Sequence, residues 1–153
     1  MRQDARRHLE DLLDREIETG RLLSATLAAE RDALTGNAAA AVEQKAAEKI
    51  ELLGILERLE NERRTLCDLA GQRLAGNVGA DESSVGKAAG ERWRALLDLM
   101  AGCRRANEVN GYIIHVRQNQ IRQLMEIVRG TVPVTYGPQG KTLGSALRAL
   151  ARA

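Results

Sequence analysis

The sequence has 153 residues, of which 29% are charged and only 2% are aromatic, and its 23 basic and 21 acidic residues leave a net charge of +2. So small an excess of positive charge argues against a nucleic-acid partner, and the scarcity of rings favours helix–helix seams over a thick enzyme core. Because the N-terminus is polar and no apolar run reaches the ~20 residues that span a bilayer, we expect a cytoplasmic protein without stable membrane insertion.

The first predicted element is a helix over residues 4–34. Its apolar residues recur in steps of three, four and seven, which places them on one stripe. These residues are Leu9, Leu12, Leu13, Ile17, Leu23, Leu27 and Leu34. Glu16, Gly20 and Glu30 interrupt the stripe at seam positions. Asn37 follows the end of the pattern, and it is a residue type that caps the start of a following helix.

A second helix is predicted over residues 38–74, followed by a loop over residues 75–86 that is rich in Gly and Ser. The stripe of this helix is predicted to consist of Val42, Ala46, Ile50, Leu53, Leu56, Leu59, Leu66 and Leu69. A third helix is predicted over residues 87–128. Its apolar positions are Trp93, Leu96, Leu97, Met100, Cys103, Ile114, Ile121, Leu124 and Val128.

No proline precedes Pro133, so nothing in the earlier sequence breaks long helices. Long helices with short connections fold back on one another. The sequence therefore predicts an all-α fold, an elongated antiparallel three-helix bundle over residues 1–130. Residues 131–153 are predicted to form a Pro/Gly turn and a short amphipathic helix, flexible until a partner binds. One side of that helix would carry Leu143, Leu147 and Leu150.

No motif in the chain supports catalysis, a metal or a cofactor. His8 and His115 lack the Glu three residues earlier that di-iron bundles require, which argues against a four-helix metal enzyme. Lys141 follows a glycine, but the earlier glycine of a phosphate-binding loop is missing. Cys67 and Cys103 sit among apolar positions and are expected to act as small hydrophobes. We therefore predict a protein that is not an enzyme and uses no cofactor.

Two asparagines fall where the third helix should be apolar. Counting from Met100 in steps of three and four reaches Cys103, Asn107 and Asn110, and Gly111 follows directly. A buried amide is tolerated where it fixes the register of a bundle or binds a polar group of a partner, and a glycine in mid-helix lets another backbone come close. Three interpretations stay open: a register device, a polar notch for a partner helix, and a plain surface face.

Three segments of the chain resemble the FlgN-type flagellar export chaperones. Residues 106–114, Ala-Asn-Glu-Val-Asn-Gly-Tyr-Ile-Ile, resemble the Asn-x-x-Asn-Gly signature of that family. Residues 135–141, Thr-Tyr-Gly-Pro-Gln-Gly-Lys, resemble the Tyr-Gly-x-x-Gly that follows the last long helix of its members. Residues 36–53 resemble the family's first turn and the start of its second helix. The resemblance covers nearly the whole chain.

This resemblance implies a chaperone of bacterial flagellar type III export. Such a protein binds the C-terminal helical segments of hook-filament junction proteins, the FlgK- and FlgL-type clients, keeps them unassembled and delivers them to the export gate. The candidate partner-binding residues are Asn107, Asn110, Gly111, Ile114, Tyr136, Gly137, Gly140, Leu143, Leu147 and Leu150. The alternative is a structural coiled-coil adaptor or self-assembling helical bundle with no export role, in which the two motifs are incidental.

Overall fold

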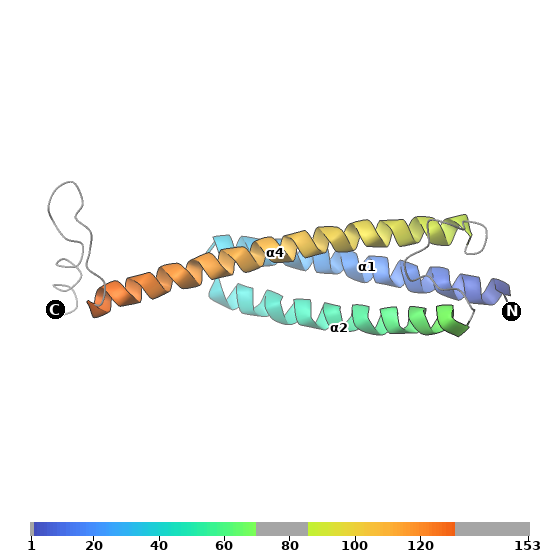
Figure 1. Ribbon diagram of the computed structural model, residues 1–153, viewed down its shortest axis with the longest axis horizontal. Helices are drawn as coiled ribbons and strands as arrows, with labels where there is room; N and C mark the ends of the chain where they lie inside the picture. Colours follow the sequence, from blue (N-terminus) through green and yellow to red (C-terminus); the bar gives the residue numbers. More distant parts are fainter. Residues whose placement is uncertain (1, 70–85, 131–153) are drawn as a thin grey trace. The chain divides into compact units, whose positions relative to one another are not determined.

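The computed structural model describes residues 2–69 and 86–130, and within these ranges the chain forms three helices and no strand. Helix α1 spans Arg2–Thr35, α2 spans Ala39–Leu69 and α4 spans Lys87–Arg129 (Figure 1). The predicted all-α, three-helix fold is confirmed, and the helix ends agree with the prediction to within a few residues wherever both are described.

Two predicted segments lie outside the described residues. Residues 70–85 contain the end of the second predicted helix and nearly all of the predicted loop, and residues 131–153 contain the predicted tail. The predicted domain boundary after residue 130 stays a prediction. The chain divides into two compact units, residues 1–110 and 111–153, and α4 contributes residues to both.

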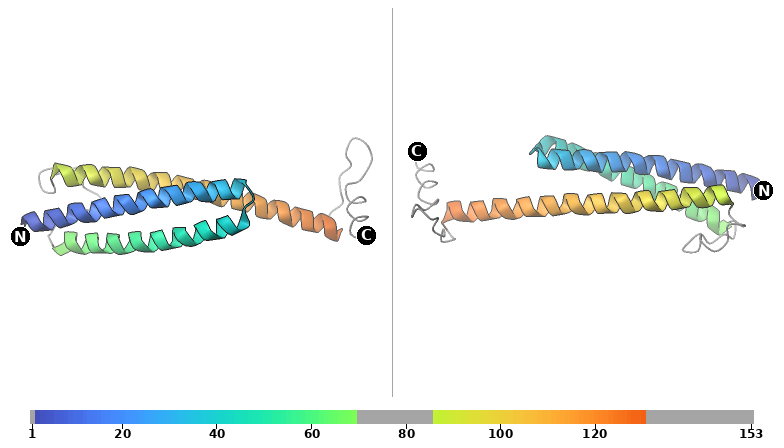
Figure 2. Two further views of the ribbon diagram at one scale, coloured as in Figure 1. Left: turned by 180° about the vertical axis from the view of Figure 1, so that it is seen from behind. Right: turned by 90° about the horizontal axis from the view of Figure 1, so that it is seen from above.

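A short turn joins α1 to α2. Asn37 has left-handed backbone with a φ of 60°, and the N–H of Ala38 donates to the Ala33 carbonyl at 3.0 Å. This six-to-one bond is typical of a Schellman C-cap, in which Asn tolerates the left-handed conformation. Asn37 thus closes α1, and the N-cap position of α2 belongs to Ala38, whose carbonyl accepts from the N–H of Val42 at 3.0 Å. So short a turn makes α1 and α2 antiparallel neighbours (Figure 2).

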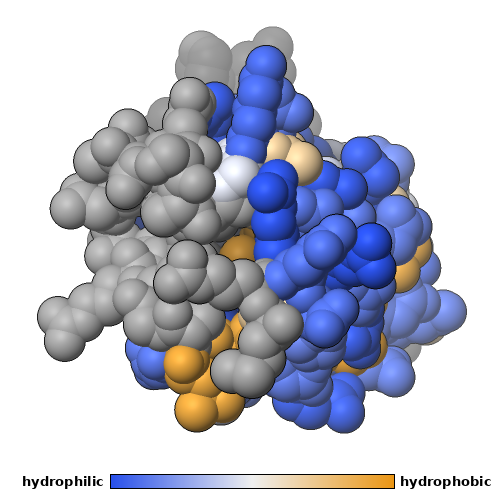
Figure 3. Space-filling view, turned by 90° about the vertical axis from the view of Figure 1, so that its right-hand side faces the viewer, coloured by the Kyte–Doolittle hydropathy of each residue, from blue (hydrophilic) through white to orange (hydrophobic). Residues whose placement is uncertain are grey.

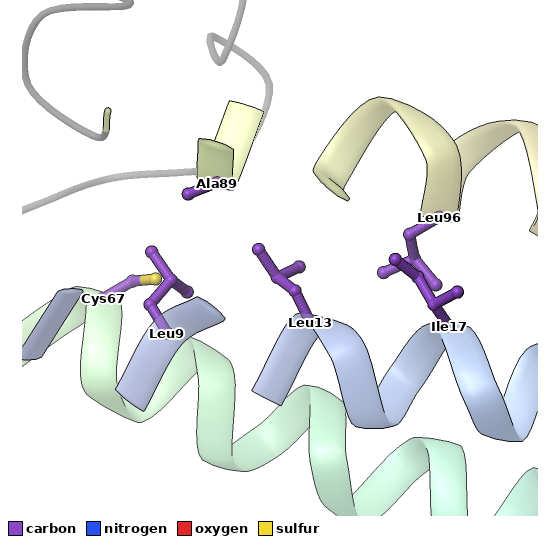
Figure 4. Close-up of a cluster of buried hydrophobic side chains, with 6 residues drawn as sticks. All are labelled: Leu9, Leu13, Ile17, Cys67, Ala89 and Leu96. Atoms are coloured by element: carbon purple, nitrogen blue, oxygen red, sulfur yellow. The ribbon is translucent and has the colours of Figure 1, made fainter. Parts of the chain in front are cut away.

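Two apolar clusters hold the first unit together. The first consists of Leu9, Leu13, Ile17, Cys67, Ala89 and Leu96 (Figure 4). The second consists of Leu23, Leu27 and Cys103. The clusters follow the same order along α1 and α4, so these helices run parallel within the first unit while α2 runs antiparallel to both. Burying such apolar stripes stabilises the bundle by about 25 cal/mol for each Å² removed from water.

The predicted stripes differ in their outcome. Every residue of the α1 stripe is buried, as predicted. The α2 stripe is partly wrong, because Ile50, Leu53 and Leu69 are exposed while Arg63 and Cys67 are buried. Charged side chains of α2 face carboxylates of α1. Apolar spacing alone therefore predicts a face of α2 that lies next to the face that is buried.

The stripe of α4 is also partly wrong within the first unit. Leu97 is exposed, and Leu99 packs against both apolar clusters in its place. Trp93 and Met100 are partly buried against the first cluster, as their predicted positions require. Within the first unit the seam of α4 therefore runs through Leu96, Leu99, Met100 and Cys103, and Leu97 lies outside it.

Polar residues dominate the outward surface of the helices at the end where the N-terminus lies. Figure 3 shows this end, with hydrophobic residues visible at only a few places among the described atoms. This distribution is that of amphipathic helices with apolar stripes turned inward. None of the helices described within residues 2–69 and 86–130 contains an apolar segment that could span a lipid bilayer.

Candidate partner-binding site

Asn110 lies at the centre of a buried polar network between α4 and α1. Only 1% of this residue is exposed. Its Nδ2 donates to the Leu27 carbonyl oxygen at 2.9 Å and to Glu30 Oε2 at 2.8 Å, and its Oδ1 accepts from Arg31 Nε at 3.2 Å. Both amide hydrogens and one oxygen lone pair are therefore used inside the bundle. Such a satisfied buried amide fixes the register of α4 on α1.

The same network extends to α2 through Glu30, a carboxylate with 1% of its surface exposed. Lys49 Nζ donates to Glu30 Oε1 at 2.8 Å and to Asn107 Oδ1 at 3.2 Å. Asn107 itself is exposed, in contrast to Asn110. The two asparagines of the signature thus occupy different environments, one inside the seam and one at its edge. Together they link all three helices at one level of the first unit.

Gly111 and Ile114 begin the second unit of the chain. Gly111 is exposed, and a Cβ added there would meet no atom within 4 Å. The close backbone approach expected at this glycine is therefore not made by the part of the chain that the structure describes. Ile114 is half-buried. Space next to Gly111 is open to an approaching molecule.

The other six candidate residues belong to the predicted tail. Tyr136, Gly137, Gly140, Leu143, Leu147 and Leu150 lie outside the described residues, and their part in a site stays a prediction.

An exposed apolar face on α4 was missed as a candidate partner surface. Four apolar residues of this face are exposed: Ile121, Leu124, Met125 and Val128. All but Met125 belong to the apolar stripe predicted for the third helix. Helical spacing identifies residues that share a face, but it does not tell whether that face is covered. We call Ile114, Ile121, Leu124, Met125 and Val128 the α4 stripe. Four of its five members are large apolar side chains in contact with water, which is typical of an interaction surface.

A second polar cluster lies deep in the first unit. Arg63 Nε donates to Glu16 Oε2 at 2.8 Å, both side chains are buried, and the guanidinium lies 4.5 Å from the centre of the Trp93 ring. Burial raises the pKa of the Glu16 carboxyl, and the charge and hydrogen bond of Arg63 oppose that rise. This arrangement joins α1, α2 and α4, and its burial makes it a structural contact rather than a surface for a partner.

The described residues offer little for catalysis. They contain no group of three or more His, Cys, Asp or Glu side chains that could hold a metal ion. Burial raises the pKa of the Cys67 thiol and of the Cys103 thiol, which keeps both protonated and unreactive at neutral pH. Both cysteines are free and buried, as expected of small hydrophobes.

Comparison with known proteins places these features in a family. A family model described as FlgN protein matches residues 1–144. The match covers the three helices, the Asn107 and Asn110 signature and the tail motif, and it stops before Leu147. Neither the curated proteins nor the solved structures gave a match to this chain.

Proposed function

The chain belongs to the FlgN family of flagellar export chaperones, and we propose that it binds the C-terminal helical segments of hook-filament junction proteins of the FlgK and FlgL type. It keeps these segments unassembled in the cytoplasm and delivers them to the flagellar export gate. A chaperone of this kind acts by holding its client, so the proposal requires no catalytic group and no cofactor.

The observation that carries the proposal is the exposure of the α4 stripe. Its members follow one another in steps of seven, three, one and three residues, which keeps them on one face of the helix. An amphipathic client helix has a matching stripe that would aggregate if left in water. Laying one stripe on the other buries both, with anchors at helical spacing supplying the affinity. The apolar faces of chaperone and client thus protect each other until export.

The signature residues have separate roles in this proposal. Asn110 positions α4 by its buried hydrogen bonds, and Ile114 follows it by one helical turn. Gly111 leaves open space beside the start of the stripe, where a client backbone can come close. Asn107 lies at the surface on the Lys49 side of the seam. The client therefore contacts Gly111 and Ile114, while Asn110 holds them in place.

The tail has a second role in the proposal, at the export gate. Tyr136, Gly137 and Gly140 form the family's tail motif, and Leu143, Leu147 and Leu150 provide an apolar side for docking. Changing Tyr136 to Ala should leave client binding intact and reduce secretion of the junction proteins by cells. Loss of client binding in purified Tyr136→Ala protein would contradict this division of roles.

The direct test is calorimetric titration of the purified chain with the C-terminal segment of a FlgK-type junction protein from the same organism. A C-terminal flagellin segment serves as the control ligand. Tight one-to-one binding of the junction segment alone is expected, with the negative heat-capacity change of apolar burial. Binding of neither segment by a folded protein would contradict the client assignment, and self-association in sedimentation would then favour a structural adaptor.

A pair of matched variants assigns the binding to the α4 stripe. Ile121 on α4 is 61% exposed and Ile50 on α2 is 69% exposed, so an Asp at either position does not disturb the core. Ile121→Asp should weaken client binding by about tenfold to a hundredfold, the loss of one buried Ile side chain. Ile50→Asp should leave the affinity unchanged. Equal effects of the two variants would place the client elsewhere.

A further inference from the structure

Charge is distributed unevenly between the two units of the chain. Residues 1–110 contain 17 basic and 20 acidic residues, a net charge of −3. Residues 111–153 contain six basic residues and one acidic residue, a net charge of +5. The overall charge of +2 conceals this contrast. Such asymmetry indicates a partner whose charge is complementary to one part of the chain.

The basic residues of α4 lie in a regular relation to the α4 stripe. Arg122 directly follows Ile121 and Arg129 directly follows Val128, so the two arginines are seven residues apart along one edge of the stripe. Both are exposed. Arg117 shares the face of the stripe itself, three residues after Ile114 and four before Ile121. Three arginines thus border or interrupt the apolar seam of this helix, and Glu126 is the single carboxylate between Arg122 and Arg129.

We propose that the α4 stripe selects an amphipathic helix that carries a row of Asp or Glu at seven-residue spacing beside its apolar seam. This inference rests on the proposed function and names the class of segment that the chaperone prefers. Charges that flank an apolar seam set partner choice and orientation in paired helices. An acidic row would face Arg122 and Arg129 along the edge, and it would accelerate association by attracting the client from a distance.

Two parts of this protein could also cover the α4 stripe, residues 131–153 and a second copy of α4, but their charges fit it poorly. Residues 131–153 contain three basic residues and no acidic residue, so they would add positive charge to the edge. A second copy of α4 brings Glu126 as its only acidic residue after Glu108. An anionic membrane would attract the arginines, but Arg117 on the apolar face would have to leave the acyl region. The charges therefore favour an acidic helix from another protein.

The test is a charge reversal in the full chain, with the FlgK-type C-terminal segment as the probe. Arg122→Glu with Arg129→Glu should weaken binding about tenfold or more, chiefly through slower association. Arg104→Glu with Arg105→Glu is the matched control, because these exposed arginines lie in the first unit and the change in net charge is the same. The control should stay within about twofold of the wild-type affinity.

Two further measurements test the same charges: the salt dependence of the affinity and a reciprocal charge change in the client. Wild-type affinity should fall as salt rises from about 0.05 M to about 0.5 M, because exposed charges are screened, and this dependence should be lost in the Arg122/Arg129 variant. A client segment with Lys at its acidic positions should bind that variant better than it binds the wild type. The inference would be overturned if the wild type bound equally well at low and high salt and the Arg122/Arg129 variant bound as well as the wild type.

The failure of this inference can be distinguished from failure of the proposed function. If Ile121→Asp weakens binding as expected while the arginine variant binds normally, the client assignment stands and the acidic preference is wrong. If the wild type binds no client segment, both are overturned. Binding of the wild type to phosphatidylglycerol vesicles, with loss in the arginine variant and no client binding, would assign the stripe to an anionic membrane instead.

Discussion

Changing Asn110 to Ala removes the centre of the polar network while leaving the helices otherwise intact. The substitution deletes a 2.8 Å hydrogen bond to the Glu30 carboxylate, a 3.2 Å hydrogen bond from Arg31 and a 2.9 Å hydrogen bond to the Leu27 carbonyl. Hydrogen bonds to charged partners contribute about 1.5–3 kcal/mol each, and Glu30 retains its bond from Lys49. The free energy of unfolding should therefore fall by about 3 kcal/mol, a large fraction of the ~5–15 kcal/mol of a typical domain.

Urea denaturation followed by circular dichroism measures this loss. At a typical slope of ~1–3 kcal/mol per molar urea, the midpoint should fall by about 1–3 M with the slope unchanged. Asn107→Ala is the matched control, because its exposed side chain has a single 3.2 Å bond from Lys49 and should cost less than about 1 kcal/mol. Equal, small costs for the two variants, with client binding lost only in Asn110→Ala, would refute the structural role of Asn110.

Three further changes test the core and the start of the stripe. Burial raises the pKa of the Glu16 carboxyl above its ordinary value of 4.5, so the folded state favours the protonated form. The stability that the protonated carboxyl contributes is therefore lost as the pH rises through the raised pKa. The stability of Glu16→Gln relative to wild type, measured by urea denaturation, should therefore increase as the pH rises above about 4.5, because the variant has no carboxyl to ionise. The opposite trend would mean that the attraction of Arg63 outweighs burial. Gly111→Ala and Gly54→Ala should each stabilise the fold by about 1 kcal/mol in thermal unfolding, since neither Cβ meets an atom within 4 Å. Weaker client titration in Gly111→Ala alone would locate a client backbone there, and equal titration curves would exclude one. Leu27→Ala should cost about 2–5 kcal/mol in urea denaturation, and a smaller loss would show that the second cluster is loosely packed.

The helices could be predicted from the sequence because most of their determinants are local. Apolar period, helix-forming residues and the position of Asn37 fix where α1 ends and α2 begins, and the whole α1 stripe is buried as predicted. The face of α2 could not be predicted in the same way. Lys49 and Arg63 face inward because Glu30 and Glu16 of α1 supply partners, and a count of apolar residues contains no information about such cross-helix pairs.

In the candidate site, too, apolar spacing did not predict which side chains are buried. Both asparagines of the signature fall on the predicted stripe, yet only Asn110 is buried, because Ala106 packs against the second apolar cluster in place of Asn107. Ile121 and Leu124 have the spacing of core residues and are exposed. Exposure depends on whether a neighbour covers the face, and this is a property of the fold rather than of the helix that carries the residues.

The polar network separates the residues that stabilise this chain from those proposed to bind its client. Asn110, Glu30 and Lys49 satisfy one another inside the first unit, so α4 holds its register there without a partner. The exposed side chains of the α4 stripe beyond Ile114 can then vary with little cost to folding, because changes to exposed residues rarely exceed about 0.5 kcal/mol. Substitutions at Ile121, Arg122 or Val128 can therefore change the client preference while Asn110 still holds the register of α4.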